Sequence, residues 1–365
     1  MSLTYIVDDQ DPAIEYLCPV NRERVHDNYL HDTYTTIAGN ECGGGWFKYT
    51  FNGTSVRVSN RLVANATYAV QVNISPMLQH TGNGIWESPP LSDERENSIV
   101  YAVGNQSLYP AFDFLTVTAG QSTQLRGKTI IVDDTDSEIQ YSGNWRTEPV
   151  SPSAMKFDYT SSPYLNTTHW SNTVGDSVTY SFEGTSVAVY GVIPASNTLF
   201  PNRNVTATYA IDGQEPTTLS FASESGLGRP IAMSQLFLSQ DLLEGKHTLV
   251  LKVTDLPDLS TSGLGLDFIT YNASFNDLSS AGKGPTVSSG ALSGGHGTLI
   301  WQPVLGALLG FIALLLGVFG WLWWRKRKHA KVQQSVKPAP VFVIDNWKGE
   351  GMDEKTKNAP LTAEV

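Results

Sequence analysis

Four short phrases occur twice, in the same order, along this chain of 365 residues. The repeated pairs are TYIVDD (4–9) and TIIVDD (129–134), FNGTSVRV (51–58) and FEGTSVAV (182–189), NATYAV (65–70) and TATYAI (206–211), and AFDFLTV (111–117) and GLDFITY (265–271). The distance between partners grows along the chain, as insertions in loops would cause. The sequence therefore predicts two copies of one folding module, residues 1–122 and 129–275, joined by a linker at 123–128.

The repeated phrases have the two-residue period of β-strands. In SVTYSF (177–182) and HTLVLKV (247–253), β-branched and aromatic residues alternate with polar or small ones. Gly53 and Gly184 stand between strand pairs, where glycine would supply the positive φ of a hairpin turn. About eight or nine such strands per copy, without an amphipathic helix, predict an all-β fold of two tandem antiparallel β-sandwiches of the jelly-roll type. The expected core residues of the second copy include Val187, Val189, Leu249, Leu251, Val253 and Phe268.

These phrases, together with EIQYSGNW (138–145) and EGKHTLVLKV (244–253), resemble those of the galactose-binding-like jelly-roll modules. The layout of the whole chain resembles fungal single-pass membrane proteins that carry such modules in tandem. The resemblance implies a scaffold more than a ligand, because strand and turn phrases carry little information about binding. The first copy departs from the pattern, since it alone has cysteines and it has ENSIVYAV (96–103) in place of EGKHTLVLKV.

An apolar run at 299–324 contains no Asp, Glu, Lys or Arg and is followed by the basic cluster at 325–328. About 20 apolar residues form a helix that spans a bilayer, and Lys and Arg are retained on the cytoplasmic side. The sequence thus predicts a transmembrane helix in the plasma membrane or another secretory-pathway membrane, with the N-terminus outside and the C-terminus in the cytoplasm. A stripe of small residues would permit a homodimer through this helix, although glycine is also common in membrane spans that do not pair: Gly306, Gly310, Ala313, Gly317 and Gly320.

Composition suggests the nature of the remaining segments. Residues 276–298 are rich in Ser, Gly and Thr and are expected to form a flexible stalk, while the charged tail at 325–365 is expected to be disordered. The chain opens with MSLTYIVDD, which has neither the charged nor the apolar part of a secretory leader. Either the membrane span directs insertion or the natural start lies upstream, and we favour a missing leader.

Seven Asn-x-Ser/Thr acceptors precede the span and none follows it, in agreement with an extracellular position. Asn73 is weakened as an acceptor by the nearby Pro76. The other six are expected glycosylation sites: Asn52, Asn65, Asn105, Asn166, Asn204 and Asn272. In the same compartment Cys18 and Cys42 are expected to form a disulfide, the alternative being two buried thiols.

Charge and motifs exclude some classes of function. Before the span, 15 Lys and Arg face 30 Asp and Glu, and so acidic a surface argues against a nucleic-acid partner. HExxH, GxSxG and glycine-rich phosphate loops are all missing from the sequence, so we expect a protein that is not an enzyme. A pair of catalytic carboxylates would leave no motif, which keeps a glycan-active enzyme as the least favoured alternative.

Acidic residues recur at equivalent positions of the two copies. Each copy has two consecutive Asp after its first strand and one more in its closing strand: Asp8, Asp9 and Asp113, then Asp133, Asp134 and Asp267. Such oxygens suit a structural calcium ion, the only cofactor that the sequence suggests. The alternative is an acidic turn that is held by local hydrogen bonds to the backbone.

Aromatic residues in loop-like contexts are candidates for sugar contacts, because the apolar face of a pyranose stacks on a ring. The candidate ligand-binding residues are Trp86, Trp145, Arg146 and Trp170, although core packing explains a tryptophan equally well. The first hypothesis is a non-enzymatic surface protein that binds carbohydrate or another extracellular or cell-wall ligand. The second is a structural, adhesive or sensor-like ectodomain without a small-ligand site.

Overall fold

The computed structural model describes residues 2–25, 29–39, 42, 45–103, 110–148, 162–193, 205–221, 231–256 and 263–282. All of these belong to one compact unit, residues 1–288. The predicted membrane helix with its small-residue stripe, the tail and most of the predicted stalk lie outside the described residues. Within the described ranges, no helix has the length and apolar character that crossing a membrane would require.

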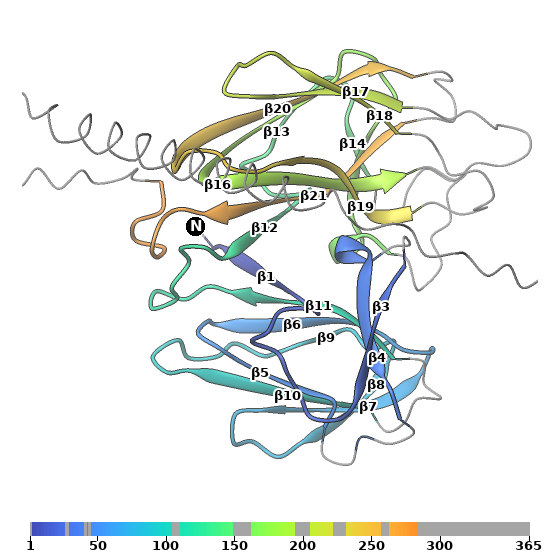
Figure 1. Ribbon diagram of the computed structural model, residues 1–365, viewed down its shortest axis with the longest axis vertical. Helices are drawn as coiled ribbons and strands as arrows, with labels where there is room; N and C mark the ends of the chain where they lie inside the picture. The colour runs from blue at the N-terminus through green and yellow to red at the C-terminus, as the bar shows by residue number, and fades with distance from the viewer. Residues whose placement is uncertain are drawn as a thin grey trace, which may run out of the picture. The chain divides into compact units, whose positions relative to one another are not determined.

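The described part of the chain consists of antiparallel strands and two short 3₁₀ turns (Figure 1). The predicted all-β class is therefore confirmed. We call residues 1–122 module 1 and residues 129–275 module 2. The elements of module 1 are β1 (Thr4–Asp8), β2 (Glu15–Tyr16), β3 (Val20–Arg24), η1 (Leu30–Asp32), β4 (Thr33–Ile37), β5 (Phe47–Phe51), β6 (Ser55–Arg61), β7 (Ala66–Val72), β8 (Leu78–Gly82), β9 (Trp86–Glu87), β10 (Asn97–Val103) and β11 (Ala111–Thr118). Those of module 2 are β12 (Thr129–Asp133), β13 (Gln140–Ser142), β14 (Arg146–Glu148), η3 (Tyr164–Asn166), β15 (Thr168–Ser171), β16 (Ser177–Ile193), β17 (Val205–Ile211), β18 (Thr217–Phe221), β19 (Ile231–Ser239), β20 (Gly245–Asp255) and β21 (Leu264–Ala273).

Each module places its first and last strands side by side, β1 with β11 and β12 with β21. In module 1 a separate sheet has the order β2-β5-β10-β7-β8. In module 2 the corresponding strands stay connected to the rest through β16, whose first part pairs with β20 and whose second part pairs with β21 and β19. Strand burial alternates with the period that the sequence predicted, and all six predicted core residues of module 2 are at most 1% exposed.

Gly53 and Gly184 correct a prediction. Neither glycine is among the residues with positive φ, and Gly184 lies inside the continuous strand β16. A Cβ atom would lie 2.6 Å from the Thr118 carbonyl oxygen at position 53 and 2.4 Å from the Asn272 carbonyl oxygen at position 184. Glycine is needed at both positions because another strand approaches closely.

The predicted disulfide between Cys18 and Cys42 is present, with the two Cα atoms 5.6 Å apart. It joins the segment after β2 to the segment before β5, and Cys42 packs into the hydrophobic core. The bridge closes a loop over a sequence separation of 24 residues. A loop of this length restricts the unfolded chain by about 3 kcal/mol.

Strands β1 and β12 lie side by side and link the two modules (Figure 1). Tyr5 pairs with Ile130, while Thr4 pairs with Ile131 and Ile6 with Thr129. Since TYI at 4–6 is the repeat of TII at 129–131, the central residues Tyr5 and Ile130 are equivalent and face each other. The flanking pairs, Thr4 with Ile131 and Ile6 with Thr129, are related by exchange of the two modules. This is the pairing of a two-fold axis, as found between identical subunits of an isologous dimer.

Candidate functional site

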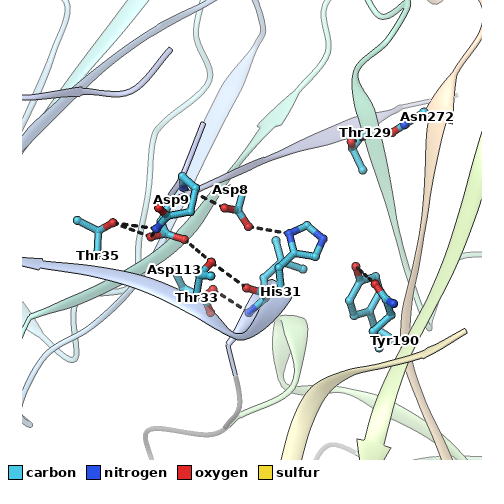
Figure 2. Close-up of polar contacts among 12 residues, drawn as sticks. Asp8, Asp9, His31, Thr33, Thr35, Asp113, Thr129, Tyr190 and Asn272 are labelled. Carbon is cyan, nitrogen blue, oxygen red and sulfur yellow. Dashed lines mark hydrogen bonds and ion pairs between the residues drawn. The ribbon is translucent and has the colours of Figure 1, made fainter. Parts of the chain in front are cut away.

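Buried acidic side chains organise the end of module 1 where β1, β4 and β11 meet (Figure 2). Asp9 is fully buried. Its Oδ1 accepts a hydrogen bond from the Thr33 hydroxyl at 2.9 Å, and its Oδ2 accepts one from the Thr35 hydroxyl at 2.6 Å. The neighbouring Asp8 is partly exposed, and its Oδ2 lies 2.8 Å from His31 Nδ1.

Asp113 holds the turn η1 in place. It occupies a β-bulge of β11, between Phe112 and Phe114, and is fully buried. Its Oδ1 accepts a hydrogen bond from the Leu30 backbone N–H at 2.9 Å, and its Oδ2 lies 3.5 Å from Arg61 Nη2. The bulge thus turns a carboxylate inward to cap a 3₁₀ turn that would otherwise bury an unpaired donor.

Module 2 repeats this network. Thr167 donates to Asp134 Oδ1 at 2.8 Å, and the Tyr164 backbone N–H donates to Asp267 Oδ1 at 2.9 Å. His169 takes the place of Thr35, with its Nδ1 2.7 Å from Asp134 Oδ2. Each network also contains a tyrosine at an equivalent position. The Tyr16 hydroxyl donates to the Asp9 backbone carbonyl, and the Tyr141 hydroxyl donates to that of Asp134, both at 2.7 Å.

Burial dominates the electrostatics of these carboxyl groups. It raises the pKa of Asp9 to about 6 and raises the pKa of Asp113 and of Asp267 well above the usual range. At Asp113 the Arg61 guanidinium opposes the increase. Val192 occupies the place of Arg61 in module 2. At Asp267 the nearby Asp134 therefore raises the pKa further, and backbone hydrogen bonds from Tyr164 and Met233 oppose the increase.

The acidic residues do not form the arrangement that the calcium hypothesis requires. No group of three or more His, Cys, Asp or Glu in the described part of the chain is placed to hold a metal ion. Hydroxyl, imidazole and backbone N–H donors contact the buried carboxylates instead. These donors are distant in sequence, so the local backbone bonds of the alternative hypothesis apply only to Asp8 and Asp133, which accept from the backbone N–H two residues ahead. In the described residues, these networks act as braces between the first strand, the 3₁₀ turn and the last strand of each module.

The structure corrects one sugar-contact prediction and qualifies the others. Trp170 is 4% exposed, its Nε1–H donates to the Thr168 hydroxyl, and a Cβ atom at Gly265 would lie 2.8 Å from its ring. It is a core residue that a ligand cannot stack on. Trp145 is half-buried with its ring centroid 5.3 Å from that of Tyr141. Arg146 is exposed and donates to Asn172 Oδ1 at 3.3 Å.

A cleft of about 390 Å³ lies over β17, β18 and β19 of module 2, a volume within the usual range of about 300–1,000 Å³ for ligand pockets. Tyr209 and Phe237 stack within it, with centroids 4.4 Å apart and planes 7° from parallel. Phe237 is half-buried, and the lining amides and carboxyl group of Gln214, Glu215 and Gln235 are exposed. Tyr209 is 1% exposed and its hydroxyl has no hydrogen-bond partner among the described residues.

The same position in module 1 is built differently. Val58 pairs with Trp86 as its repeat equivalent Val189 pairs with Phe237, so the predicted ligand residue Trp86 is the counterpart of Phe237. Tyr68, the counterpart of Tyr209, stacks on His80 at 5.6 Å and donates to the Ile85 carbonyl at 3.1 Å. The tyrosine hydroxyl therefore has a hydrogen-bond partner in module 1 and none among the described residues of module 2.

Sequence reasoning missed both Tyr209 and Phe237, although the phrases NATYAV and TATYAI contain Tyr68 and Tyr209 at equivalent positions. The segment at 231–239 matches no phrase of module 1 and is located only by its pairing with β16. The cleft of module 2 is consequently the candidate ligand site that the structure adds.

The predicted glycosylation sites differ in their surroundings. Asn52, Asn65 and Asn166 are exposed at turns. Asn272 is half-buried within β21 and its Oδ1 accepts a hydrogen bond from the Thr129 hydroxyl at 2.9 Å. Asn105 and Asn204 lie outside the described residues, and glycosylation of all six stays a prediction.

No protein-family model and no curated protein matches the chain. Similar solved structures include a family two carbohydrate esterase from Cellvibrio japonicus, with 16% identity over 41% of this chain and 35% of that chain and a TM-score of 0.27. A two-domain esterase active on acetylated mannans has 16% identity over 43% of this chain and 38% of that chain, with a TM-score of 0.31. The chain thus spans well under half the length of these esterases. The CBM22-1-CBM22-2 tandem domain from Paenibacillus barcinonensis Xyn10C has 11% identity over 74% of this chain and 93% of that chain, with a TM-score of 0.26.

These neighbours are carbohydrate-binding modules and carbohydrate-active enzymes. Their identities and TM-scores are too low to assign an activity or a ligand to this chain.

Proposed function

We propose that the protein binds carbohydrate, and that the cleft over β17, β18 and β19 is its binding site. The observation that carries the proposal is the Tyr209 hydroxyl, which is buried, has no hydrogen-bond partner among the described residues and lies beside a partly exposed aromatic ring. An unsatisfied buried hydroxyl costs about 1–3 kcal/mol. A ligand that supplies a hydrogen-bond partner offsets this cost.

The cleft has the mixture of groups that a sugar requires. Phe237 offers a partly exposed ring to the apolar face of a pyranose, while Gln214 and Gln235 offer amide donors and acceptors to its hydroxyls. Glu215 adds a carboxylate acceptor at the same surface. A neutral or cationic glycan suits such a cleft better than an acidic one, because the described residues of its lining include a carboxylate and no Lys or Arg.

Binding without turnover is part of this proposal. Glycosidases position two carboxyl groups on either side of the scissile bond, whereas Glu215 is the single carboxylate that the described residues bring to the lining of the cleft. We further propose that each module is a jelly-roll β-sandwich, and that the run at 299–324 anchors both modules on the outer side of a membrane. An extracellular or cell-wall glycan is then the ligand.

A glycan array with the purified protein tests the proposal. We expect saturable binding that weakens at least tenfold in Phe237→Ala and in Gln235→Ala. Gln140→Ala removes an exposed amide from β13, outside the cleft, and serves as the matched control with unchanged binding. A blank array, or binding that neither cleft variant alters, would contradict the proposal and favour the adhesive alternative. Release of products from a bound glycan would instead favour an enzyme.

A further inference from the structure

The cleft of module 2 has two walls that belong to differently paired strands. One wall is the β17–β18 hairpin, which pairs with β20, and the other is β19, which pairs with β16. Leu242, in the loop that follows β19, extends the second wall. We call residues 240–244 the wall loop. The width of the cleft therefore depends on how the wall loop is held relative to the hairpin.

His247, near the start of β20, joins the two walls. Its Nδ1 lies 2.7 Å from Oδ2 of Asp212, the residue directly after Ile211, which lines the cleft. Its Nε2 lies 2.7 Å from the carbonyl oxygen of Leu243, the neighbour of Leu242. The His247 side chain is 10% exposed. One imidazole ring thus connects the end of a lining strand to the wall loop.

Both partners of the His247 ring are acceptors. A carboxylate and a backbone carbonyl have no proton to donate, and a neutral imidazole has a single N–H. Both contacts are therefore hydrogen bonds only in the imidazolium. When the ring is neutral, the N–H stays with the carboxylate, which is the stronger acceptor, and the Nε2 lone pair faces the Leu243 oxygen. Loss of one proton thus replaces an attraction to the wall loop by a repulsion.

Among the described residues, Asp212 is the charged group that faces His247. Strand β16 presents the uncharged ring of Phe182, whose centroid lies 5.4 Å from that of the imidazole. Glu183 and Lys246, which pair across β16 and β20, extend from the opposite face of these strands. The remaining charged residues of the wall loop and the hairpin turn are exposed: Asp241, Glu244 and Glu215.

The contacts of His247 also set the pH range in which it is charged. Burial alone would lower the pKa of His247, but its two hydrogen bonds outweigh burial and raise this pKa above the usual value of about 6.5. The connection to the wall loop is therefore complete below a pH of about 6.5 and is lost as the pH rises through the raised pKa.

Module 1 builds the same connection from groups that do not titrate. Asn97 pairs with Phe51 of the repeated phrase. His247 pairs with Phe182, the equivalent of Phe51, so Asn97 is its counterpart. Asn97 Oδ1 accepts a hydrogen bond from Asn73 Nδ2 at 2.9 Å, and its own amide donates to a carbonyl of the preceding loop at 2.8 Å. The scaffold thus needs a connection at this place, and the Asp–His pair of module 2 adds a sensitivity to pH.

We propose that the imidazolium of His247 holds the wall loop against the hairpin, and that loss of its proton loosens the loop and weakens glycan binding in the cleft. The binding step rests on the proposed function, whereas the loosening of the loop requires no glycan. Two other contacts keep the wall loop attached: the Leu242 N–H donates to the Thr185 carbonyl at 2.9 Å, and Glu244 contacts Arg126 at 2.7 Å. A neutral His247 therefore loosens the wall loop without unfolding the module.

Amide hydrogen exchange of the full-length protein without glycan tests the wall loop, with the hydrogen-bonded Leu242 N–H as the reporter. After correction for the intrinsic rate at each pH, its exchange is expected to be at least tenfold faster at pH 8 than at pH 5.5. Asp212→Asn combined with His247→Asn introduces the pair of module 1 and should exchange equally at both pH values. Equal corrected rates in the wild type would overturn the proposal.

The matched control removes another Asp–His contact, outside the cleft. His31 Nδ1 lies 2.8 Å from Asp8 Oδ2 in module 1, and Asp8→Asn combined with His31→Asn should keep the pH response of the wild type. A control that loses the response as the cleft variant does would show that the response does not come from His247, and would overturn the proposal.

Titration with neutral pentasaccharides tests the effect on binding. Cellopentaose, mannopentaose, xylopentaose and chitopentaose carry no titratable group in this range, so any pH dependence comes from the protein. We expect the Kd of a pentasaccharide that binds to be at least fivefold higher at pH 8 than at pH 5.5 in the wild type, and equal at both in the cleft variant. A Kd that does not change in the wild type overturns the control of binding by His247. If no pentasaccharide binds at either pH while exchange at Leu242 responds, the proposed function fails and the role of His247 in the wall loop stands.

Discussion

The imidazole Nδ1 of His169 lies 2.7 Å from the buried Asp134 carboxylate, where Thr35 contacts Asp9 in module 1. Two chemically different donors thus serve one position of the repeated brace. Removing the donor altogether leaves a buried carboxylate oxygen without this partner. Such a loss costs about 1–3 kcal/mol or more when the acceptor is charged.

We therefore expect His169→Ala to lower the free energy of unfolding by about 1–3 kcal/mol. His169→Thr introduces the residue that module 1 uses and should recover most of the loss, because Thr35 reaches its carboxylate at 2.6 Å. Urea unfolding at pH 7, followed by tryptophan fluorescence, measures both variants. Equal losses in the two variants would show that ring packing against Tyr141, whose centroid is 4.0 Å away, matters more than the hydrogen bond.

Gly53 and Gly184 predict a second pair of stability effects. A Cβ atom at either position would overlap a backbone carbonyl oxygen of the neighbouring strand, and backbone yields less readily than a side chain. Gly53→Ala and Gly184→Ala are each expected to cost at least about 1–3 kcal/mol. Gly39→Ala is the matched control, since nothing lies within 4 Å of its added Cβ atom and its φ is not positive. A control that loses as much stability as the two variants would refute the close-approach explanation.

The repeated phrases allow the hydrogen-bond networks of the two modules to be matched only in part. The phrases that contain the Asp residues align directly, so sequence alone placed the same carboxylates in both copies. The turns do not align by similarity, because the sequence pairs Tyr29-Leu30 with Tyr164-Leu165, whereas the hydrogen bonds to Asp113 and Asp267 pair Leu30 with Tyr164. Which donor reaches each carboxylate depends on this shift of one residue.

The candidate sites were less predictable for a related reason. A tryptophan in sequence is equally consistent with a core and with a sugar platform, and Trp170 became core because glycine at 265 leaves room for its ring. The cleft depends on side chains that the pairing of distant strands brings together. Phe237 carries no sequence signal of its role, because its position at the cleft depends on the pairing of β19 with β16.

Asp9 predicts a dependence of stability on pH. Its carboxyl group has a pKa of about 6 in the folded protein and about 3.9 in the unfolded chain. Because the folded protein binds this proton more tightly than the unfolded chain does, protonation of Asp9 stabilises the fold, and it does so fully at pH values below the pKa of the unfolded chain. This stabilisation is lost as the pH rises from about 4 to about 6. The free energy of unfolding should therefore fall over this range by on the order of 2 kcal/mol more in the wild type than in Asp9→Asn, which cannot titrate. Urea unfolding at several pH values measures the difference, and parallel profiles would refute the assignment.

Removal of divalent cations should leave the fold unchanged. In the described residues, the six repeated Asp do not form a group that could hold a metal ion, and hydrogen-bond donors occupy the buried oxygens of Asp9 and Asp134. We expect the midpoint of thermal unfolding to be the same with EDTA and with added calcium. A higher midpoint with calcium would restore the metal hypothesis and contradict the brace.

Substitutions of Trp170 and of Phe237 should differ in their effects, the first lowering stability and the second weakening glycan binding, when both quantities are measured on the same samples. Trp170 is buried against Val192 and Gly265, so Trp170→Ala is expected to lower the free energy of unfolding by about 3–5 kcal/mol. Phe237 is half-buried at the cleft, so Phe237→Ala should cost less stability and should remove glycan binding. Urea unfolding gives the first quantity, and titration with the best ligand from the array gives the second. Because Trp170 lies outside the cleft lining, any Trp170→Ala protein that remains folded should bind as the wild type does, and a folded variant that cannot bind would return Trp170 to the candidate site.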